Sequence, residues 1–229
     1  MLRWLNSLFR QNHCFAVIFL FGVCIFCLVC YTFGMKVSYL GSATDAKKVK
    51  DYGKVEIALA GRSNVGKSSL LNALAQSNIA RTSKTPGRTR MINFFDFENF
   101  VLVDLPGYGF AKASKTEQQN WQGMIEGYFM ASKNLKHVFV LVDANLKMQA
   151  SDEQMIKYLF FYNIPFTIIA TKVDKIAKSK RYHVIKSLAA DFKVGEQNVF
   201  GVSAEDRIGL DELKARIAQI LEASVNETI

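Results

Sequence analysis

The segment Gly61–Ser68, which reads Gly-Arg-Ser-Asn-Val-Gly-Lys-Ser, constrains this chain more than any other part of it. It follows Val55–Ala60, an apolar run of strand length, and precedes Ser69–Ala75, which consists mostly of good helix formers. A strand, a glycine-rich loop and a helix are the context that a phosphate-binding P-loop requires. The glycines let backbone N–H groups turn toward phosphate oxygens, and the positive end of the helix dipole lies at the same place.

The residues of this loop have distinct expected parts in binding a nucleoside triphosphate. Lys67 should neutralise charge on the β- and γ-phosphates, and the hydroxyl of Ser68 should ligate Mg²⁺. The other residues expected to cradle the phosphates are Gly61, Arg62, Ser63, Asn64, Val65 and Gly66.

A second motif indicates which base the site accepts. The apolar run Ile164–Ala170 ends in Thr171-Lys-Val-Asp174, a variant of the guanine-recognition pattern N-K-x-D. Asp174 should accept hydrogen bonds from N1–H and the 2-amino group of guanine, which adenine lacks, so the motif argues against an ATPase. The Lys172 stem should lie over the base, while Thr171 in place of Asn leaves one base contact open.

Two further segments fit the same site. Val173 completes the T-K-x-D turn. The S-A-x element Ser203-Ala204-Glu205 follows Val202 at a strand end, where a backbone N–H should contact guanine O6. Asn64 in the P-loop either helps to hold a potassium ion against the phosphates, as in some P-loop GTPases, or only stabilises the loop.

The segment Asp104-Leu105-Pro106-Gly107 reads D-x-x-G and follows a predicted pair of strands, Ile92–Phe97 and Phe100–Asp104. Asp104 should hold Mg²⁺ through water, and the Gly107 N–H should sense the γ-phosphate. Tyr108 stands where many GTPases have a glutamine that orients the attacking water, and a phenol is a poor substitute. We therefore expect slow intrinsic GTP hydrolysis that a partner or a cation must stimulate.

Residues 79–91 contain proline, glycine, hydroxyl residues and cations with little hydrophobic period, which predicts a loop where GTPases keep their first switch. Thr89 is the expected switch residue, its hydroxyl completing the Mg²⁺ shell and its N–H sensing the γ-phosphate, with Thr85 as second choice. The residues expected to contact nucleotide here are Gly87, Arg88, Thr89, Arg90 and Met91. The loop cations meet nucleotide phosphate, RNA phosphate or only water.

The charge of the chain indicates the kind of partner that it binds, and its cysteine content indicates the redox compartment. The chain has 229 residues, half of them apolar, and a net charge of +9, of which +7 belongs to residues 35–229 because Arg3 and Arg10 are the only charges before them. This balance indicates an anionic partner such as RNA, an acidic protein or a lipid surface, or else a merely basic surface. The basic run after Asp174 (Lys175, Lys178, Lys180 and Arg181) either faces RNA or is solvated. All four cysteines precede residue 31, which fits a reducing compartment.

Residues 1–34 form a hydrophobic extension before the GTP-binding domain of residues 35–229. The 20 residues 14–33 carry no charge and are long enough to span a bilayer. One interpretation is a membrane anchor, and the lysines that follow would then keep the domain on the cytoplasmic side. The other is that residues 1–34 come from an early start, since Met35 begins a lead-in of suitable length. Either way we expect a cytoplasmic domain.

Four segments together resemble the bacterial EngB (YihA/YsxC) family of ribosome-assembly GTPases over about residues 35–225: G-R-S-N-V-G-K-S-S-L, S-K-T-P-G-R-T-R-x-x-N-F-F, D-L-P-G-Y-G-F-A-K and T-K-x-D. The resemblance implies one Ras-like G domain, GTP with Mg²⁺, and a part in maturing the large ribosomal subunit, on which normal cell division and growth depend. It also supports Thr89 as the switch residue. Members of the family begin near the position of Met35 and typically lack a membrane segment.

The expected fold is α/β, with a mostly parallel six-stranded sheet and helices on both faces. GTP and Mg²⁺ should order residues 79–91 and 107–115, which then bind precursor large-subunit RNA and proteins until hydrolysis releases them. We expect a monomer off the ribosome. The alternative function is a membrane-anchored regulatory GTPase without a ribosome role, for which residues 14–33 are the support.

Overall fold

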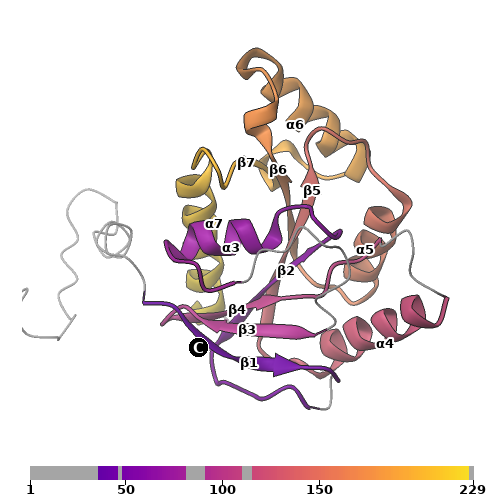
Figure 1. Cartoon of the computed structure of the whole chain (residues 1–229), viewed down its shortest axis with the longest axis vertical. Helices are drawn as coiled ribbons and strands as arrows, with labels where there is room; N and C mark the ends of the chain where they lie inside the picture. Colours follow the sequence, from indigo (N-terminus) through magenta and orange to yellow (C-terminus); the bar gives the residue numbers. More distant parts are fainter. Residues whose placement is uncertain (1–35, 46–47, 81–90, 110–114, 227–229) are drawn as a thin grey trace, which may run out of the picture. The chain divides into compact units, whose positions relative to one another are not determined.

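One mixed sheet organises the computed structural model, which describes residues 36–45, 48–80, 91–109 and 115–226. Within these ranges the sheet has seven strands in the order β1-β3-β4-β2-β5-β6-β7 (Figure 1). The strands are β1 (Ser38–Ala43), β2 (Val55–Gly61), β3 (Ile92–Asp96), β4 (Phe100–Asp104), β5 (Leu135–Asp143), β6 (Phe166–Thr171) and β7 (Val199–Val202).

The expected number of six strands is wrong, because a seventh strand, β1, forms at Ser38–Ala43. This strand pairs antiparallel with β3, and the ring of Tyr39 lies 5.5 Å from the ring of Phe95. The rest of the sheet follows the expected α/β pattern. The strand β2 pairs in parallel with both β4 and β5, and β6 and β7 continue the parallel part.

Five α-helices cover the two faces of the sheet in the described part of the chain (Figure 1). They are α3 (Lys67–Ala75), α4 (Lys115–Ala131), α5 (Ala150–Phe161), α6 (Lys178–Phe192) and α7 (Leu210–Asn226). Alternate residues of β2 point to opposite faces, so Ile57 and Leu59 pack with α3 and α7, while Ala58 and Ala60 belong to the core under α4, α5 and α6. Two buried layers of side chains therefore hold the central strand.

The start of α5 brings an acidic side chain into the protein interior. The N-cap is Gln149, whose backbone N–H donates to the Asp152 carboxylate at 3.2 Å, while the Asp152 N–H donates to the Gln149 carbonyl at 2.9 Å. This reciprocal arrangement satisfies two backbone donors at the helix start. It also brings the Asp152 side chain inside, where only 1% of its surface is exposed.

The helices that the structure describes include none with both the length and the apolar character needed to cross a membrane. The predicted span of residues 14–33 lies outside the described residues.

His137 on β5 is a buried titratable group, and its ring nitrogen Nε2 lies 2.9 Å from the hydroxyl of Thr167. Burial, together with the positive charge of Arg216, lowers the pKa of His137 from 6.5 to about 3. Below its ordinary pKa the unfolded chain takes up a proton at this residue that the folded chain does not. Stability is therefore full above pH 6.5 and is lost as the pH falls from there toward 3.

Lowering the pH from about 7 to about 5.5 should reduce the free energy of unfolding by about 1 kcal/mol through this residue. Urea unfolding of wild type and His137→Gln at both pH values measures the effect, which the variant should lack. The matched control is His183→Gln on the exposed part of α6, which should keep the wild-type dependence. Equal pH dependence in wild type and His137→Gln would refute the assignment.

Candidate functional site

The P-loop begins where β2 ends and runs directly into α3. Two residues adopt left-handed backbone conformations: Asn64 with φ 63° and Gly66, the N-cap of α3, with φ 111°. Glycine and asparagine tolerate this region best, which explains their presence in this turn. The Lys67 ammonium donates to the Gly61 carbonyl at 3.3 Å and closes the loop on itself. The first backbone N–H groups of a helix have no acceptor within the helix, so the start of α3 next to this loop suits an anionic ligand.

Two opposite charges lie together beneath this loop. Burial lowers the pKa of Lys67, and the negative charge of Asp104 opposes this shift. Burial raises the pKa of Asp104, and the positive charge of Lys67 opposes that shift. Asp104 is 5% exposed, and its Oδ1 has no hydrogen-bond partner among the described residues. A buried, unpartnered carboxylate oxygen beside a helix N-terminus fits the second coordination sphere of a hydrated divalent cation.

The D-x-x-G segment is joined to the P-loop by backbone hydrogen bonds. The Ser63 N–H donates to the Tyr108 carbonyl at 3.1 Å, and the Tyr108 N–H donates to the Gly61 carbonyl at 3.3 Å. Residues 104–107 therefore continue the line of β4 beside β2 and bring Gly107 against Ser63, whose backbone nitrogen would lie 3.0 Å from a Cβ at position 107. The two predicted phosphate-contacting segments are thus adjacent.

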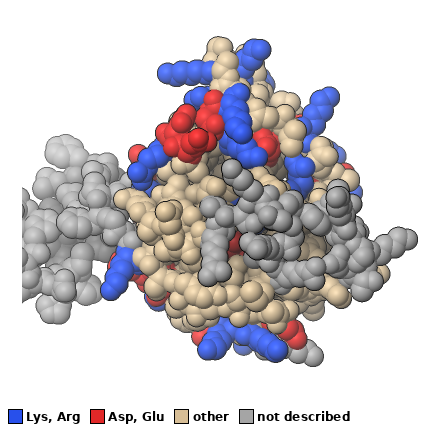
Figure 2. Space-filling model, in the orientation of Figure 1, with Lys and Arg blue, Asp and Glu red and all other residues tan. Residues whose placement is uncertain are grey.

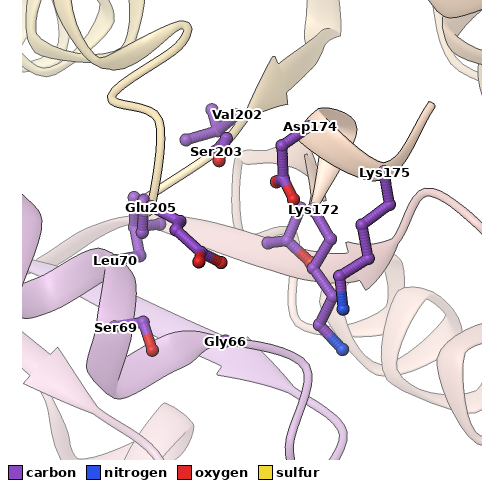
Figure 3. A pocket seen from close by; sticks show the side chains of 11 residues that line it. Gly66, Ser69, Leu70, Lys172, Asp174, Lys175, Val202, Ser203 and Glu205 are labelled. Atoms are coloured by element: carbon purple, nitrogen blue, oxygen red, sulfur yellow. The ribbon is translucent and has the colours of Figure 1, made fainter. Parts of the chain in front are cut away.

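The predicted base-recognition residues also come together, around a cavity of about 160 Å³. It lies between the start of α3, the turn after β6 and the loop after β7 (Figure 3). The predicted residues that line it are Gly66, Thr171, Lys172, Asp174, Val202, Ser203 and Ala204. Figure 3 shows the carboxylates of Asp174 and Glu205 directed toward the enclosed space from opposite sides. The cavity thus presents hydrogen-bond acceptors within reach of the P-loop.

Thr171, which replaces the usual asparagine, connects the two halves of the site. Its hydroxyl lies 2.7 Å from the Val65 carbonyl and 3.0 Å from the Val142 carbonyl, and donates its single hydrogen to these acceptors. The hydroxyl therefore ties the end of β6 to the P-loop rather than contacting the cavity.

Lys172 bridges the same two halves through its side chain. Its backbone is left-handed with φ 60°, and its ammonium donates to the Asn64 carbonyl at 3.1 Å and to the Asp143 carboxylate at 2.7 Å. Burial acts to raise the pKa of Asp143, but hydrogen bonds from Lys172 and Asn145 hold it below its ordinary value. The stem of Lys172 is consequently fixed along one wall of the cavity.

Several residues that line the cavity were not predicted to contact the nucleotide. They are Ser69, Leu70, Lys175 and Glu205, of which Lys175 was named only in the basic run and Glu205 only as the variable position of the S-A-x element. Asp143 could have been found from its place at the end of a buried strand. Conversely, Leu105 and Val173 are buried in the core, so their side chains do not reach the site. Met91 is described and exposed, whereas the predicted Gly87, Arg88, Thr89 and Arg90 lie outside the described residues.

Comparison with known proteins indicates the family to which the chain is similar. A family model described as 50S ribosome-binding GTPase matches residues 56–172. The probable GTP-binding protein EngB of Aquifex aeolicus is 44% identical over 185 residues, covering 80% of this chain and 99% of its own length. The EngB protein of Metamycoplasma arthritidis is 46% identical over 176 residues, covering 76% and 95%.

Solved structures place the fold in the same class. A crystal structure of a probable GTP-binding protein EngB has a TM-score of 0.63 at 28% identity and covers 74% of this chain and 100% of its own. Era in complex with MgGDPNP and nucleotides 1506–1542 of 16S ribosomal RNA has a TM-score of 0.59 at 25% identity, covering 73% and 56%. The protein is thus a GTP-binding P-loop GTPase of the Ras-like fold. Within that class, the chain belongs to the EngB family.

Removing the hydroxyl in Thr171→Val should weaken binding of GDP and of a GTP analogue alike, by about 5–10-fold, because a hydrogen bond worth about 1 kcal/mol between β6 and the P-loop is lost. Titration with fluorescent nucleotides measures both affinities. Thr171→Ser keeps the hydroxyl and should bind almost as wild type does. If valine and serine variants bind equally well, the hydroxyl has no such role.

Proposed function

We propose that this GTPase is a switch needed for assembly of the large ribosomal subunit, and thereby for normal cell division and growth. The observation that carries the proposal is the family match over residues 56–172, whose description names the 50S ribosome. The solved complex of Era with ribosomal RNA supports it, because that protein shares the fold at 25% identity.

The cavity supports specificity for guanine nucleotides. Asp174 supplies a carboxylate that would accept hydrogen bonds from N1–H and the 2-amino group of guanine, and Lys172 would flank the base with its stem. The backbone at Ser203 and Ala204 would meet guanine O6. The Ser203 side chain is buried, and its hydroxyl accepts a hydrogen bond from the Asp206 N–H at 3.1 Å, which fixes this loop.

The cation site follows from the buried Asp104. Asp104 would hold Mg²⁺ through water, Ser68 at the start of α3 would ligate it directly, and Thr89 of the first switch would complete the shell. When bound, Mg²⁺ would neutralise negative charge on the β- and γ-phosphates. Asn64 would serve a potassium ion at the phosphates, a role compatible with its exposed position in the P-loop turn.

Catalysis in this proposal depends on positioning and electrostatics. Lys67 and the P-loop amides would stabilise charge on the phosphates, and the Gly107 N–H would sense the γ-phosphate. Tyr108 is 5% exposed and packs against Trp121 with ring centroids 5.6 Å apart, so its phenol occupies the core rather than the space of an attacking water. Intrinsic hydrolysis is therefore slow until a ribosomal partner or a cation completes the site.

The surface that fits an RNA partner is formed by α6 and the turn before it. Figure 2 shows Lys and Arg side chains gathered at the end of the molecule where Figure 1 places α6. The exposed lysines of this basic surface are Lys175, Lys178, Lys180, Lys186 and Lys193. Phosphate backbones bind such clusters by releasing condensed counterions. Because Lys175 also lines the cavity, RNA binding here would lie next to the nucleotide.

The base preference has a direct test in Asp174→Asn. The amide presents a donor toward the position of the guanine 2-amino group, so affinity for GDP should fall by at least about 100-fold while affinity for xanthosine diphosphate rises. Competition binding with the two diphosphates measures the exchange. Glu205→Gln, which changes the other cavity carboxylate, is the matched control and should leave GDP preferred. Unchanged GDP preference in Asp174→Asn would remove this carboxylate from base recognition.

The ribosome role has its test in sucrose gradients of full-length protein mixed with cell ribosomes and GDP, GTP or a non-hydrolysable GTP analogue. The protein should migrate with the large subunit or its precursors only in the analogue. Lys178→Glu, Lys180→Glu and Lys186→Glu combined should weaken that association roughly tenfold or more.

The matched control carries the same charge change at the exposed residues Lys133, Lys147 and Lys157 and should still bind. Absence of nucleotide-dependent association in wild type would overturn the assembly role. An equal loss in both triple variants would assign the effect to net charge rather than to α6. The membrane-anchored alternative rests on residues 14–33 and stays a prediction from the sequence.

A further inference from the structure

Three polar side chains meet at the junction of the P-loop, residues 107–109 and α5. They are Arg62, Tyr108 and Asp152, and together we call them the switch cluster. Each contributes a buried atom without a hydrogen-bond partner among the described residues: Arg62 Nε, the Tyr108 hydroxyl and Asp152 Oδ1. Buried polar atoms without partners are rare, so three in one cluster require an explanation.

Asp152 is the charged centre of the switch cluster. Its Oδ2 lies 3.4 Å from Arg62 Nε and accepts the Gln149 N–H, while the side chain as a whole is 1% exposed. Burial raises the pKa of Asp152, and the charge of Arg62 opposes this shift. The Asp152 carboxylate in turn helps to raise the pKa of Tyr108, which burial already places well above its ordinary value. The phenol and the carboxylate thus lie near each other without closing a well-formed hydrogen bond.

Tyr108 is held on its other sides by α4 and by the P-loop. Its ring meets the Trp121 ring edge-on, and the Trp121 indole N–H donates to the Pro106 carbonyl at 2.8 Å. Its backbone exchanges hydrogen bonds with Gly61 and Ser63. Only the hydroxyl end of the side chain depends on Asp152 and Arg62.

The next residue confirms how closely α5 and the P-loop approach this segment. Gly109 has φ 70°, and a Cβ built there would lie 3.0 Å from the Ser151 hydroxyl and 3.2 Å from side-chain carbons of Arg62. The chain after Tyr108 therefore passes between the start of α5 and the Arg62 stem, where a larger residue would not fit.

We propose that Asp152 is a positioning residue for the γ-phosphate site: through its ion pair with Arg62 and its place beside the buried end of Tyr108, it fixes the Gly107 N–H in the place where the third phosphate of GTP is bound. The inference rests on the proposed role of Gly107 in the nucleotide site. Gly107 directly precedes Tyr108 and packs on Ser63, so a displacement of Tyr108 moves Gly107 relative to the P-loop. GDP has no γ-phosphate, and its binding is independent of this N–H.

The affinities for GTP and GDP distinguish this positioning role from a general effect on stability. Loosening the whole domain weakens both nucleotides, whereas loosening Gly107 weakens only the triphosphate and lowers kcat. A conservative change at Asp152 should therefore alter the ratio of the two affinities. Tyr108→Phe, which removes only the hydroxyl, should alter the ratio in the same direction by a smaller factor.

The experiment compares affinities for GDP and for a non-hydrolysable GTP analogue, together with kcat for GTP, in full-length wild type, Asp152→Asn and Tyr108→Phe. In Asp152→Asn we expect the analogue to bind about 5–20-fold more weakly, GDP binding to change less than about twofold, and kcat to fall. The double variant should lose less than the product of the two single effects, because both changes break the same cluster.

Glu153→Gln is the matched control, since it removes the neighbouring carboxylate on α5, which is exposed and paired with Lys157. It should leave both affinities and kcat unchanged. An equal loss of GDP and analogue binding in Asp152→Asn, or wild-type ratios in both Asp152→Asn and Tyr108→Phe, would overturn the proposal. Should Asp152→Asn fail to fold, Tyr108→Phe alone decides. Failure of wild type to bind GTP would instead count against the nucleotide site itself.

Discussion

The parallel pairing of β2 with both β4 and β5 is the constraint on which the rest of the site depends. Parallel neighbours end at the same edge of a sheet, so the pairing brings the last residues of three strands together without any local signal between them. Gly61 ends β2, Asp104 ends β4 and Asp143 ends β5. Gly61 is the first residue of the P-loop, Asp104 lies near Lys67, and Asp143 accepts a hydrogen bond from Lys172. The apolar character of the three strands thus determines where the polar residues meet.

This arrangement also explains why charged groups are tolerated under the loop. Burying Asp104 and Lys67 opposes folding, because each loses water and the Oδ1 of Asp104 gains no protein partner. Opposite charges at close range lessen this cost. A bound nucleotide and cation would lessen it further, so ligand binding and folding are coupled through this pair. Binding of a nucleotide and a cation would therefore stabilise the folded domain.

Sequence reasoning recovered the parts of the site that lie within short motifs. The P-loop, D-x-x-G, T-K-x-D and S-A-x segments each contain their own turn chemistry, and the structure brings them to one edge of the sheet. The strand β1 is hard to predict from the sequence, because residues 36–54 are polar and rich in lysine and the strand forms by pairing with β3. The cap of α5 at Gln149 is hard to predict from the sequence, since Ser151 is a better local cap residue and the outcome depends on the burial of Asp152.

The residues that sequence reasoning missed share a physical cause. Asp143 and Asp152 act on Lys172 and Arg62, which are 29 and 90 positions away in the chain. No periodicity or spacing links residues so distant, and an aspartate at a strand end or a helix start has ordinary local explanations. Their roles follow only once β5 lies between β2 and β6. Thr89 and its neighbours, by contrast, lie outside the described residues, so their prediction still rests on the motif.

Asp143 and Asp152 lie at the two ends of the connection between β5 and α5. Each forms an ion pair with a basic side chain of the site. Asp143 fixes the ammonium of Lys172 beside the cavity, and Asp152 lies against Arg62 near Tyr108. A shift of this connection would therefore change base binding and γ-phosphate sensing together. Since Lys172 also donates to the Asn64 carbonyl, both anchors act on the same P-loop. In the proposed nucleotide site, the β5–α5 connection would thus link the residues for the base with those for the third phosphate, although it carries none of the motifs by which the family is recognised.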